Sequence, residues 1–569
     1  MDDLTPGQRW RRGAWTAAAL GPIAGGAEAC LCLITTGMDL SIPERLAVVV
    51  AAVATHTALA VALAFAFGFV HPRFFARDPV SGLATQLGLT AAAICALHTL
   101  PLASRHDALG EAGVAGTLIA QVPLVGLLSF YAIRVLHHVA GAAFAPALLG
   151  LGLTLCAAGA AAPAPPSTSK PVGAHPGLVL ITLDALPAAA LDDGSSPHLA
   201  AFAASARVYR NAVAPTSSAV ANAASLLTGM HPLRHGVIDD AGALRPGTPT
   251  FARWIAAEQA APDALISDLR LGAHTGLDAG FTTWRTGSTG APARGVDATH
   301  LTRRAWGARL AGPVRTPGAD LLAHALPRVG ALDGRVLWVH FGGARAPWAG
   351  VDLPDHGVDE ATRAEADRAA RGARTAVDAD LGALLDAIPP DASVVLAGLR
   401  GAVTGQHGHG PEAAALWDES VRVPIVIRAP GATPGVLDDQ ASLLDLAPTI
   451  AHLVGLSAPR VEGVNLLPPL DAAPELPSWH LLYGQEPDGT PLIGLRTDDL
   501  KAMFDVRSKD IAVYDLANDP GERADISSSQ PEIAATIAGL LARERVASES
   551  FVPVRALPSD LAARFAEER

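Results

Sequence analysis

Cysteine is nearly absent from the sequence, and its distribution limits the chemistry open to most of the chain. The only cysteines are Cys30, Cys32, Cys95 and Cys156, all in the apolar N-terminal third. Disulfide and thiol chemistry are therefore excluded from everything that follows them. Lysine is rarer still, with Lys170, Lys501 and Lys509 alone, so almost all the basic residues are arginines.

The chain also lacks the surplus of positive charge that nucleic-acid-binding proteins carry on one face. Its 42 Lys and Arg residues and 55 Asp and Glu residues give a formal net charge of -13. A surface of this sign repels polyanions. We therefore expect no nucleic-acid partner.

Charged residues make up only 17% of the chain, whereas hydrophobic residues reach 50% and the mean hydropathy is +0.29. This composition is too apolar for a purely soluble protein. Five apolar stretches each approach the ~20 residues that span a bilayer, whereas a cleaved signal peptide needs only one shorter stretch. They cover residues 14–37, 46–70, 83–103, 114–136 and 139–161. We predict that residues 1–161 form a transmembrane domain of about five helices, with the lipid bilayer as partner.

Arginines around these stretches predict how the chain crosses the membrane. Arg9, Arg11, Arg12, Arg73, Arg77 and Arg134 fall on one side, and only Arg45 and Arg105 fall on the other. By the positive-inside rule the N-terminus is cytoplasmic, and an odd number of spans leaves the rest of the chain outside the cytoplasm. Merging the last two spans would invert this topology. The chain is thus expected in the inner or plasma membrane, and Glu28, within the first span, is a candidate for a membrane function.

After a Pro-rich linker at 162–177, the sequence changes to strands that alternate with helices. The stretch Leu178–Leu186, "LVLITLDAL", is a continuous apolar run that delivers Asp184 at its end, as a buried parallel strand does. Runs of the same character cover 335–341, 392–398 and 423–431, and helical patterns cover 196–206 and 373–388. The alternation predicts an α/β layered domain whose site lies beyond the carboxyl ends of its strands, where Asp184 is placed.

Six stretches, in this order, resemble the sulfatase branch of the alkaline phosphatase superfamily. They are residues 178–186, 224–237, 276–284, 417–431, 445–456 and 513–526. The resemblance implies an alkaline-phosphatase/sulfatase-like α/β sandwich at 178–470 and a small C-terminal subdomain at 471–569. It also implies a calcium ion held by carboxylates and a formylglycine nucleophile made from Cys or Ser.

The family's nucleophile position is filled by a residue that cannot react. Counting back from Leu227, Thr228 and Gly229, that position falls on Ala219, and the family's supporting arginine falls on Ala223. Alanine can neither be oxidised to an aldehyde nor attack sulfur or phosphorus. If the alignment is shifted by one to three residues, a Ser or Thr hydroxyl takes the nucleophile position, although no arginine follows it at the required spacing. The alternative is that the hydroxyls before Ala219 bond within the loop and cap the next helix. The three fallback nucleophiles are Ser218, Ser217 and Thr216.

The metal-binding positions are altered as well. Ala185 follows Asp184, and the later strand that usually ends in two metal ligands ends here in Leu399 and Arg400. One carboxylate cannot hold a cation that takes six to eight oxygens. We therefore expect no cofactor, and we expect the guanidinium of Arg400 to pair with Asp184 in place of the metal. Arg345, at a position where the family has a polar substrate-binding element, is a second candidate for that role.

Two histidines in "GQHGHG" are the remaining candidates for metal chemistry. His407 and His409 could ligate zinc if a third ligand approached; the alternative is a solvated Gly-rich loop. Asp184 with His407 and a water is the least implausible residual constellation, and Asp184 is the third weak metal candidate. Asp239 and Asp240 are interpreted as a polar turn. The candidate ligand-binding residues are Asp184, Arg345, Arg400 and His407, of which the two arginines could together hold an anion.

These observations leave three functions open. The first is a membrane-anchored, extracytoplasmic sulfatase-like domain that has lost catalysis and binds, scaffolds or regulates, with an envelope or anionic small molecule as ligand. The second is a hydrolase of sulfuric or phosphoric esters with a relocated nucleophile. The third is an envelope phospho-group transferase, because such transferases also join several spans to this fold. Partner proteins and oligomeric state do not follow from the sequence.

Overall fold

The computed structural model describes residues 175–547, with gaps at 241, 246, 273–274, 287–317, 347, 349–350, 352, 354–356, 409–415, 468–475, 477–478 and 486–489. The five predicted spans, Glu28 and most of the linker lie outside this range. Within it, no helix has the length and the apolar character needed to cross a bilayer.

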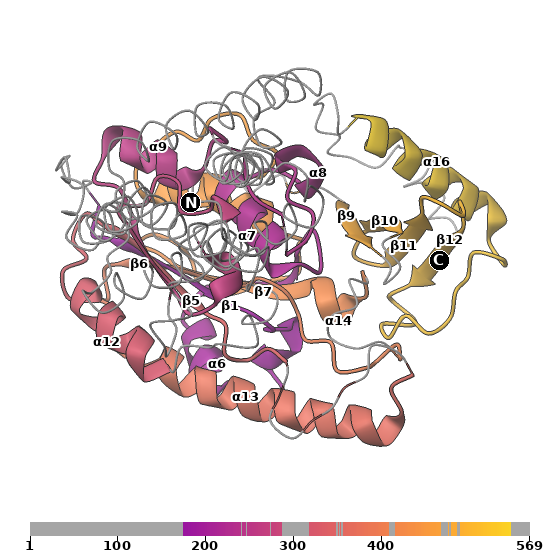
Figure 1. Cartoon of the computed structure of the whole chain (residues 1–569), viewed down its shortest axis with the longest axis horizontal. Coiled ribbons are helices and arrows are strands. Elements are labelled where there is room, and N and C mark those ends of the chain that lie inside the picture. The colour runs from indigo at the N-terminus through magenta and orange to yellow at the C-terminus, as the bar shows by residue number, and fades with distance from the viewer. Residues whose placement is uncertain are drawn as a thin grey trace, which may run out of the picture. The chain divides into compact units, whose positions relative to one another are not determined.

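An eight-stranded sheet forms the centre of the described chain (Figure 1). Its order is β4 (Thr283–Thr286), β3 (Asp263–Ile266), β5 (Val336–Phe341), β1 (Leu178–Leu183), β6 (Ser393–Gly398), β7 (Arg422–Arg428), β2 (Arg207–Val213) and β8 (Gly435–Leu437). The first five strands of this order run parallel to one another. The carboxyl ends of β1, β5 and β6 therefore meet at one edge, where the residues that follow each strand come together.

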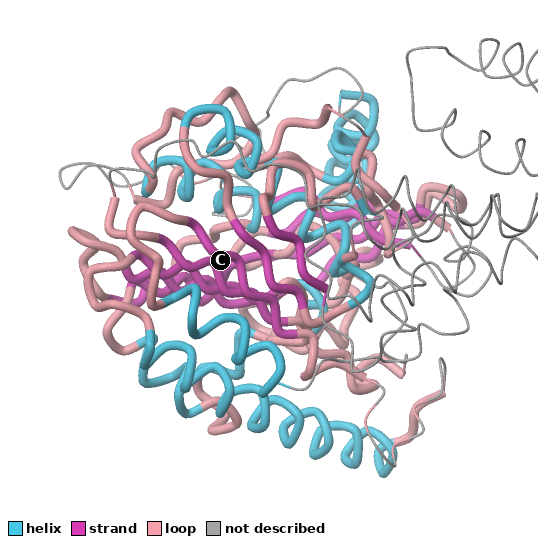
Figure 2. The backbone as a smooth tube through the Cα atoms, turned by 60° about the vertical axis from the view of Figure 1, so that its left-hand side comes forward, coloured by secondary structure: helices cyan, strands magenta, loops and turns pink. Residues whose placement is uncertain are grey.

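The strands are apolar on both faces because helices cover the sheet on both sides (Figure 2). Along β1, Leu178 and Leu180 face one core, whereas Val179 and Ile181 face the other. The first core packs against α7 (Ala219–Thr228), α9 (Phe251–Glu258) and α15 (Leu446–Leu453). The second packs against α6 (Pro197–Ala203), α12 (Gly318–Val329) and α13 (Glu360–Ala387). Burial on both faces explains why these strands read as unbroken apolar runs rather than as alternating ones.

Two expectations about these elements are corrected. The helix expected at 373–388 is the second half of the 28-residue α13, which begins after Asp359, whose side chain accepts a hydrogen bond from Thr362 N at 2.8 Å. Its first half is too polar to show an apolar period. The run at 423–431 forms β7 over Arg422–Arg428, and β7 pairs with β6 in the antiparallel direction, not in the parallel one expected.

A second, four-stranded antiparallel sheet lies within the C-terminal part of the chain. Its order is β12 (Ile511–Asp515), β11 (Leu500–Asp505), β10 (Pro491–Arg496) and β9 (His480–Gln485). One face packs against α16 (Pro531–Ala547), and the other packs against Val213 of the large sheet and Val421. The short helices are α8 (Pro232–His235) and α14 (Asp418–Val421), with single turns at Ala188–Leu191, Leu269–Leu271 and Leu443–Asp445.

Candidate functional site

Asp184 lies at the carboxyl end of β1 and is surrounded by arginines. Its side chain is completely buried, and its Oδ1 atom accepts a hydrogen bond from Arg400 Nε at 2.9 Å. Its Oδ2 atom accepts a hydrogen bond from Arg270 Nη2, and Arg345 Nε lies 4.0 Å from the same oxygen. The expected ion pair between Asp184 and Arg400 is therefore present, and Arg345 lies at its margin. Ligand binding by Asp184, Arg345 and Arg400 stays a prediction.

Arg270 connects Asp184 to two further carboxylates. It follows β3, and its Nε atom donates to Asp268 Oδ2 at 3.0 Å while its Nη1 atom donates to Asp240 Oδ2 at 2.8 Å. Arg270 and Asp268 are mostly buried, with side-chain exposures of 17% and 14%, whereas Asp240 is 34% exposed. We call Asp184, Asp240, Asp268, Arg270, Arg345 and Arg400 the Asp–Arg cluster, which balances three negative charges with three positive ones.

The cluster holds its carboxyl groups ionised. Burial alone would raise the pKa of Asp184, but the charges of Arg400, Arg270 and Arg345 outweigh it and hold that pKa well below its usual range. Burial is opposed in the same way at Asp240 and Asp268, chiefly by Arg270, so both pKa values are lowered. In return, these carboxylates raise the pKa of Arg270 in spite of its own burial. Each charge in the cluster is thus stabilised by its neighbours.

The cluster does not suit the calcium ion that the fold family implies. Both oxygens of Asp184 are bound to guanidinium groups, and its neighbours Ala185 and Leu399 offer only aliphatic side chains. Across the described chain, the only metal-like group with donor atoms all within 4.8 Å of one another lies elsewhere, at His407. Ala185 keeps a left-handed backbone (φ 56°), which is unusual for alanine, so the strand end retains a sharp turn without a metal ligand.

The position that should carry the nucleophile is closed. Ala219 is the first residue of α7 and is completely buried. Ser218 caps this helix, as its sequence position suggested: Ala221 N donates to Ser218 Oγ at 3.2 Å, and Ser218 Oγ donates to Asp240 Oδ1 at 2.6 Å. The structure thus gives Asp240 three partners, Ser218 Oγ, Val220 N and Arg270, where the sequence suggested only a polar turn.

The other two fallback hydroxyls are buried. The single hydroxyl proton of Thr216 has two acceptors within reach, Asn222 Oδ1 at 3.1 Å and Ser218 O at 3.2 Å, and Thr216 Oγ1 accepts a hydrogen bond from Ser218 N at 2.9 Å. Ser217 is 5% exposed, and its carbonyl oxygen lies 3.4 Å from Arg400 Nη1. Loop hydrogen bonding therefore accounts for the observed contacts of Thr216.

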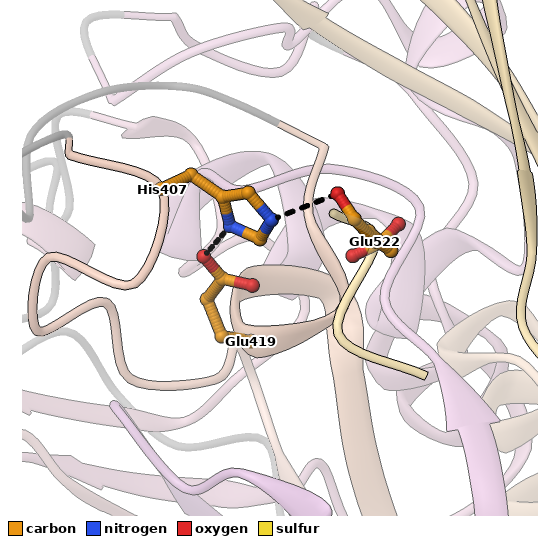
Figure 3. Close-up of side chains that lie close together, drawn as sticks. All are labelled: His407, Glu419 and Glu522. Atoms are coloured by element: carbon orange, nitrogen blue, oxygen red, sulfur yellow. Dashed lines mark hydrogen bonds and ion pairs between the residues drawn. The ribbon is translucent and has the colours of Figure 1, made fainter. Parts of the chain in front are cut away.

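His407 lies in a different group from Asp184. Its Nδ1 atom is 2.6 Å from Glu419 Oε1, and its Nε2 atom is 3.2 Å from Gly521 O and 3.3 Å from Glu522 O (Figure 3). The ring of Trp417 stacks on the imidazole, with ring centroids 3.8 Å apart. The three hydrogen-bond partners of the ring nitrogens are oxygen acceptors, so the arrangement suits a protonated imidazolium, which donates from both nitrogens. Glu419 supplies the main attraction that raises the pKa of His407 against the opposing effect of burial. His409 lies outside the described residues.

The carboxylate of Glu522 is already occupied by other partners. Its Oε1 atom lies 2.8 Å from Lys501 Nζ, and its Oε2 atom accepts a hydrogen bond from Asp418 N at 2.7 Å. Lys501 is completely buried and also binds Asp418, which forms two further hydrogen bonds with Arg496 at 2.9 and 2.8 Å. A metal ion between His407, Glu419 and Glu522 would have to displace these bonds. The group therefore joins the loop after β6 to the C-terminal part of the chain.

Sequence reasoning missed Arg270, Asp268, Glu419 and Glu522. A signal for the first two was present in "ALISDLR", Ala264–Arg270, where an apolar run ends in a carboxylate just as β1 ends in Asp184. Glu419 and Glu522 lie in stretches that carried the family resemblance, but no local pattern places them beside His407, from which they are 12 and 115 residues away.

Comparisons of sequence find similarity to one family model and to sulfatases. Residues 178–287 match the model of the type I phosphodiesterase / nucleotide pyrophosphatase family. An uncharacterized sulfatase, YidJ of Escherichia coli, is 27% identical over 154 residues, which cover 26% of this chain and 31% of that protein. The choline-sulfatase of Rhizobium meliloti is 26% identical over 168 residues, covering 27% of this chain and 31% of that protein. The chain thus matches under a third of the length of either relative.

A comparison of structures extends the likeness over most of the described residues. The crystal structure of a putative sulfatase from Bacteroides thetaiotaomicron superposes with a TM-score of 0.52 at 15% sequence identity. The superposition covers 66% of this chain and 93% of that one. At this identity the likeness concerns the fold alone.

Proposed function

We propose that this chain, a sulfatase-like member of the alkaline phosphatase superfamily, is a membrane-anchored binding protein that has lost ester hydrolysis. The observation that carries the proposal is the pair of guanidinium groups, from Arg270 and Arg400, bound to the two oxygens of Asp184. In such a site a divalent cation would have to neutralise the oxyanion and activate the nucleophile. A guanidinium group provides positive charge but cannot generate a nucleophile.

The loss at the nucleophile position supports the same conclusion independently. Ala219 stands where formylglycine would form, and its methyl group is completely buried. The positions that the family resemblance marks as altered follow β1, β5 and β6 or begin α7, so the changes are spread over four segments around the strand ends. A role in binding, scaffolding or regulation requires neither the metal nor the nucleophile.

The membrane part of the proposal rests on the sequence. Five apolar stretches before residue 162, with arginines concentrated on one side of them, favour an anchor in the inner or plasma membrane. With an odd number of spans, the sulfatase-like domain lies on the extracytoplasmic side. A cysteine-accessibility assay at Ser205, an exposed position of the domain, would test this topology, because a membrane-impermeant thiol reagent should label Ser205→Cys in intact cells.

A second candidate function is ester hydrolysis by Ser218, favoured by the hydrogen bond of 2.6 Å between Ser218 Oγ and Asp240 Oδ1. A general base must have a pKa near the working pH to accept the proton of the serine. The pKa of Asp240 is instead lowered, because Arg270 and Arg400 outweigh its burial. Asp240 is therefore a weak base, and the hydrogen bond suits helix capping better than catalysis. A transferase that uses Thr216 is disfavoured by the bonds that this side chain already makes.

Hydrolysis assays on the purified full-length chain in detergent test the proposal. We expect no turnover of 4-nitrophenyl sulfate or 4-nitrophenyl phosphate above the level of a Ser218→Ala variant. The matched control is Ser225→Ala, which removes a buried hydroxyl further along α7. Turnover that Ser218→Ala abolishes and Ser225→Ala retains would establish the hydrolase instead.

A further inference from the structure

A cavity of about 750 Å³ opens beside the Asp–Arg cluster without including it. It lies beyond the ends of β1 and β6, where residues that follow these strands meet α13, the start of β7 and the segment 520–523. Its polar lining is dominated by charged groups, among them Arg374, His407, Arg422 and Arg523. The volume is in the range of small-molecule sites.

On the side of the cavity formed by α13, the carboxylates have arginine partners. Asp193 Oδ2 lies 3.1 Å from Arg374 Nη2 and 3.5 Å from Arg371 Nη1. Glu360 accepts two hydrogen bonds from Arg363, which also lies 3.9 Å from Asp367. These carboxylates are therefore neutralised within the cavity wall.

On the opposite side, the carboxylates are neutralised as well. Asp418 binds both Arg496 and Lys501, and Glu419 binds His407. These bonds involve buried or mostly buried cations, so they persist when the cavity fills with solvent. The carboxylates of the lining are thus already paired with cations and do not neutralise the remaining arginines.

Arg422 is the exception among the half-buried cations of the lining. Its Nη2 atom donates to Asn211 Oδ1 at 2.7 Å, a neutral partner, and its Nε atom is buried without a hydrogen bond within the described chain. Burial and the nearby charge of Arg496 lower the pKa of Arg422, and Asp418 offsets this only in part. The environment therefore leaves this guanidinium short of negative charge.

Arg523 adds a second positive charge at the cavity rim. It is exposed, and the described part of the chain places no carboxylate within ion-pair distance of its side chain. The acid that it influences is Glu360, which is already bound to Arg363. Arg422 and Arg523 are therefore the two arginines of the lining whose guanidinium groups have no carboxylate partner among the described residues, in a chain whose net charge is -13.

We propose that this cavity binds the oxyanion group of a sulfate or phosphate monoester through Arg422, with Arg523 at the rim. Guanidinium groups bind such oxyanions through paired hydrogen bonds, and burial strengthens the attraction. The remaining lining, which is polar and internally paired, suits a hydrophilic organic part such as a sugar. The inference gives the proposed binding function a ligand class, but it rests on residues outside the Asp–Arg cluster.

Calorimetric titration of the full-length chain with 4-nitrophenyl sulfate and 4-nitrophenyl phosphate tests the proposal, with neutral 4-nitrophenol as reference. Arg422→Gln should weaken ester binding by about tenfold or more, the loss of one charge-assisted hydrogen bond. The matched control is Arg428→Gln, because Arg428 lies at the other end of β7, is also half-buried and does not line the cavity. Binding of either ester supports the proposal, and the ester that binds more tightly shows whether the cavity prefers a sulfate or a phosphate group.

Three results would overturn this inference. One is the absence of ester binding at millimolar concentration, and another is equal binding by Arg422→Gln and Arg428→Gln, with both folded by circular dichroism. The third is binding that Arg400→Gln abolishes while Arg422→Gln retains it, which would place the ligand at the Asp–Arg cluster. Ester turnover, by contrast, would contradict the proposed loss of hydrolysis. Whether the cavity binds the ester would still be decided by comparing ester binding of Arg422→Gln with that of Arg428→Gln.

Discussion

The Nε atom of Arg400 donates a hydrogen bond of 2.9 Å to the Oδ1 atom of Asp184, joining two strand ends that are 216 residues apart in the sequence. Asp184 is completely buried, and the side chain of Arg400 is 9% exposed. A buried carboxylate without a partner would be costly, and here the partner is a permanent part of the chain. The strand edge is therefore held together without a bound cation.

Removing Arg270 should destabilise the domain strongly. Arg270→Met leaves two mostly buried carboxylates without their shared partner, and loss of one member of a buried ion pair costs about 3 to 5 kcal/mol. Arg428→Met is the matched control, because Arg428 is half-buried but has no carboxylate partner among the described residues. Urea unfolding followed by tryptophan fluorescence measures the difference; equal midpoints for the two variants would contradict a structural role for Arg270.

Acid should unfold the domain partly through Asp184. Its pKa is lower in the folded chain than in the unfolded one, where the pKa of an aspartate is about 3.9. The stabilisation is therefore fully present above about pH 4 and is lost as the pH falls through the folded pKa. Replacement by asparagine removes this titration, so Asp184→Asn should show a shallower loss of unfolding free energy with falling pH. The exposed Asp391→Asn serves as control, and parallel pH profiles for all three proteins would refute the prediction.

His407 should make the domain less stable at high pH. Glu419 and the carbonyl groups of Gly521 and Glu522 face its ring, and its pKa is raised. Its contribution is thus fully present below the unfolded pKa of about 6.5 and is lost as the pH rises through the folded pKa.

A thermal-unfolding series between pH 6 and pH 9 tests this behaviour. Between these pH values the unfolding free energy of the wild type should fall by about 1.5 to 3 kcal/mol more than that of His407→Asn. This is the contribution of a hydrogen bond to a charged group. His452→Asn, a change at an exposed histidine of α15, should keep the wild-type profile. A His407→Asn variant that loses stability with pH as steeply as the wild type would show that another group is responsible.

Ser218 should matter for stability and not for turnover. Its side chain caps α7, and replacing a capping serine by alanine costs about 1 kcal/mol. Ser218→Ala should therefore unfold at lower urea concentration, while any ester turnover stays at background. An unchanged unfolding midpoint would contradict the capping role.

The sequence predicts the fold better than it predicts the site. Apolar runs such as Leu178–Leu183 are continuous because helices cover both faces of the sheet, so the pattern alone identifies buried strands. The pairing of Asp184 with Arg400 follows from two strand ends that the family resemblance aligns. Arg270 was missed because its strand, β3, has only four residues and its role depends on two contacts distant in the sequence, with Asp184 and Asp240.

His407 shows why motif spacing alone was insufficient. The neighbouring histidine suggested a zinc site, whereas the partners in the structure come from α14 and from the segment after β12. Only the folded chain brings Glu419 and Gly521 to the two ring nitrogens. The full length of α13 and the antiparallel course of β7 likewise depend on packing that short sequence windows do not contain.

Calorimetric titration of the purified chain with Ca²⁺, and in parallel with Mn²⁺ and Zn²⁺, tests most directly whether guanidinium groups have replaced the metal. With Arg270 and Arg400 bound to both oxygens of Asp184, we predict no binding tighter than about millimolar and no rise in unfolding temperature. Stoichiometric micromolar binding that Asp184→Asn abolishes would contradict the account, because it would show that the carboxylate still serves a metal.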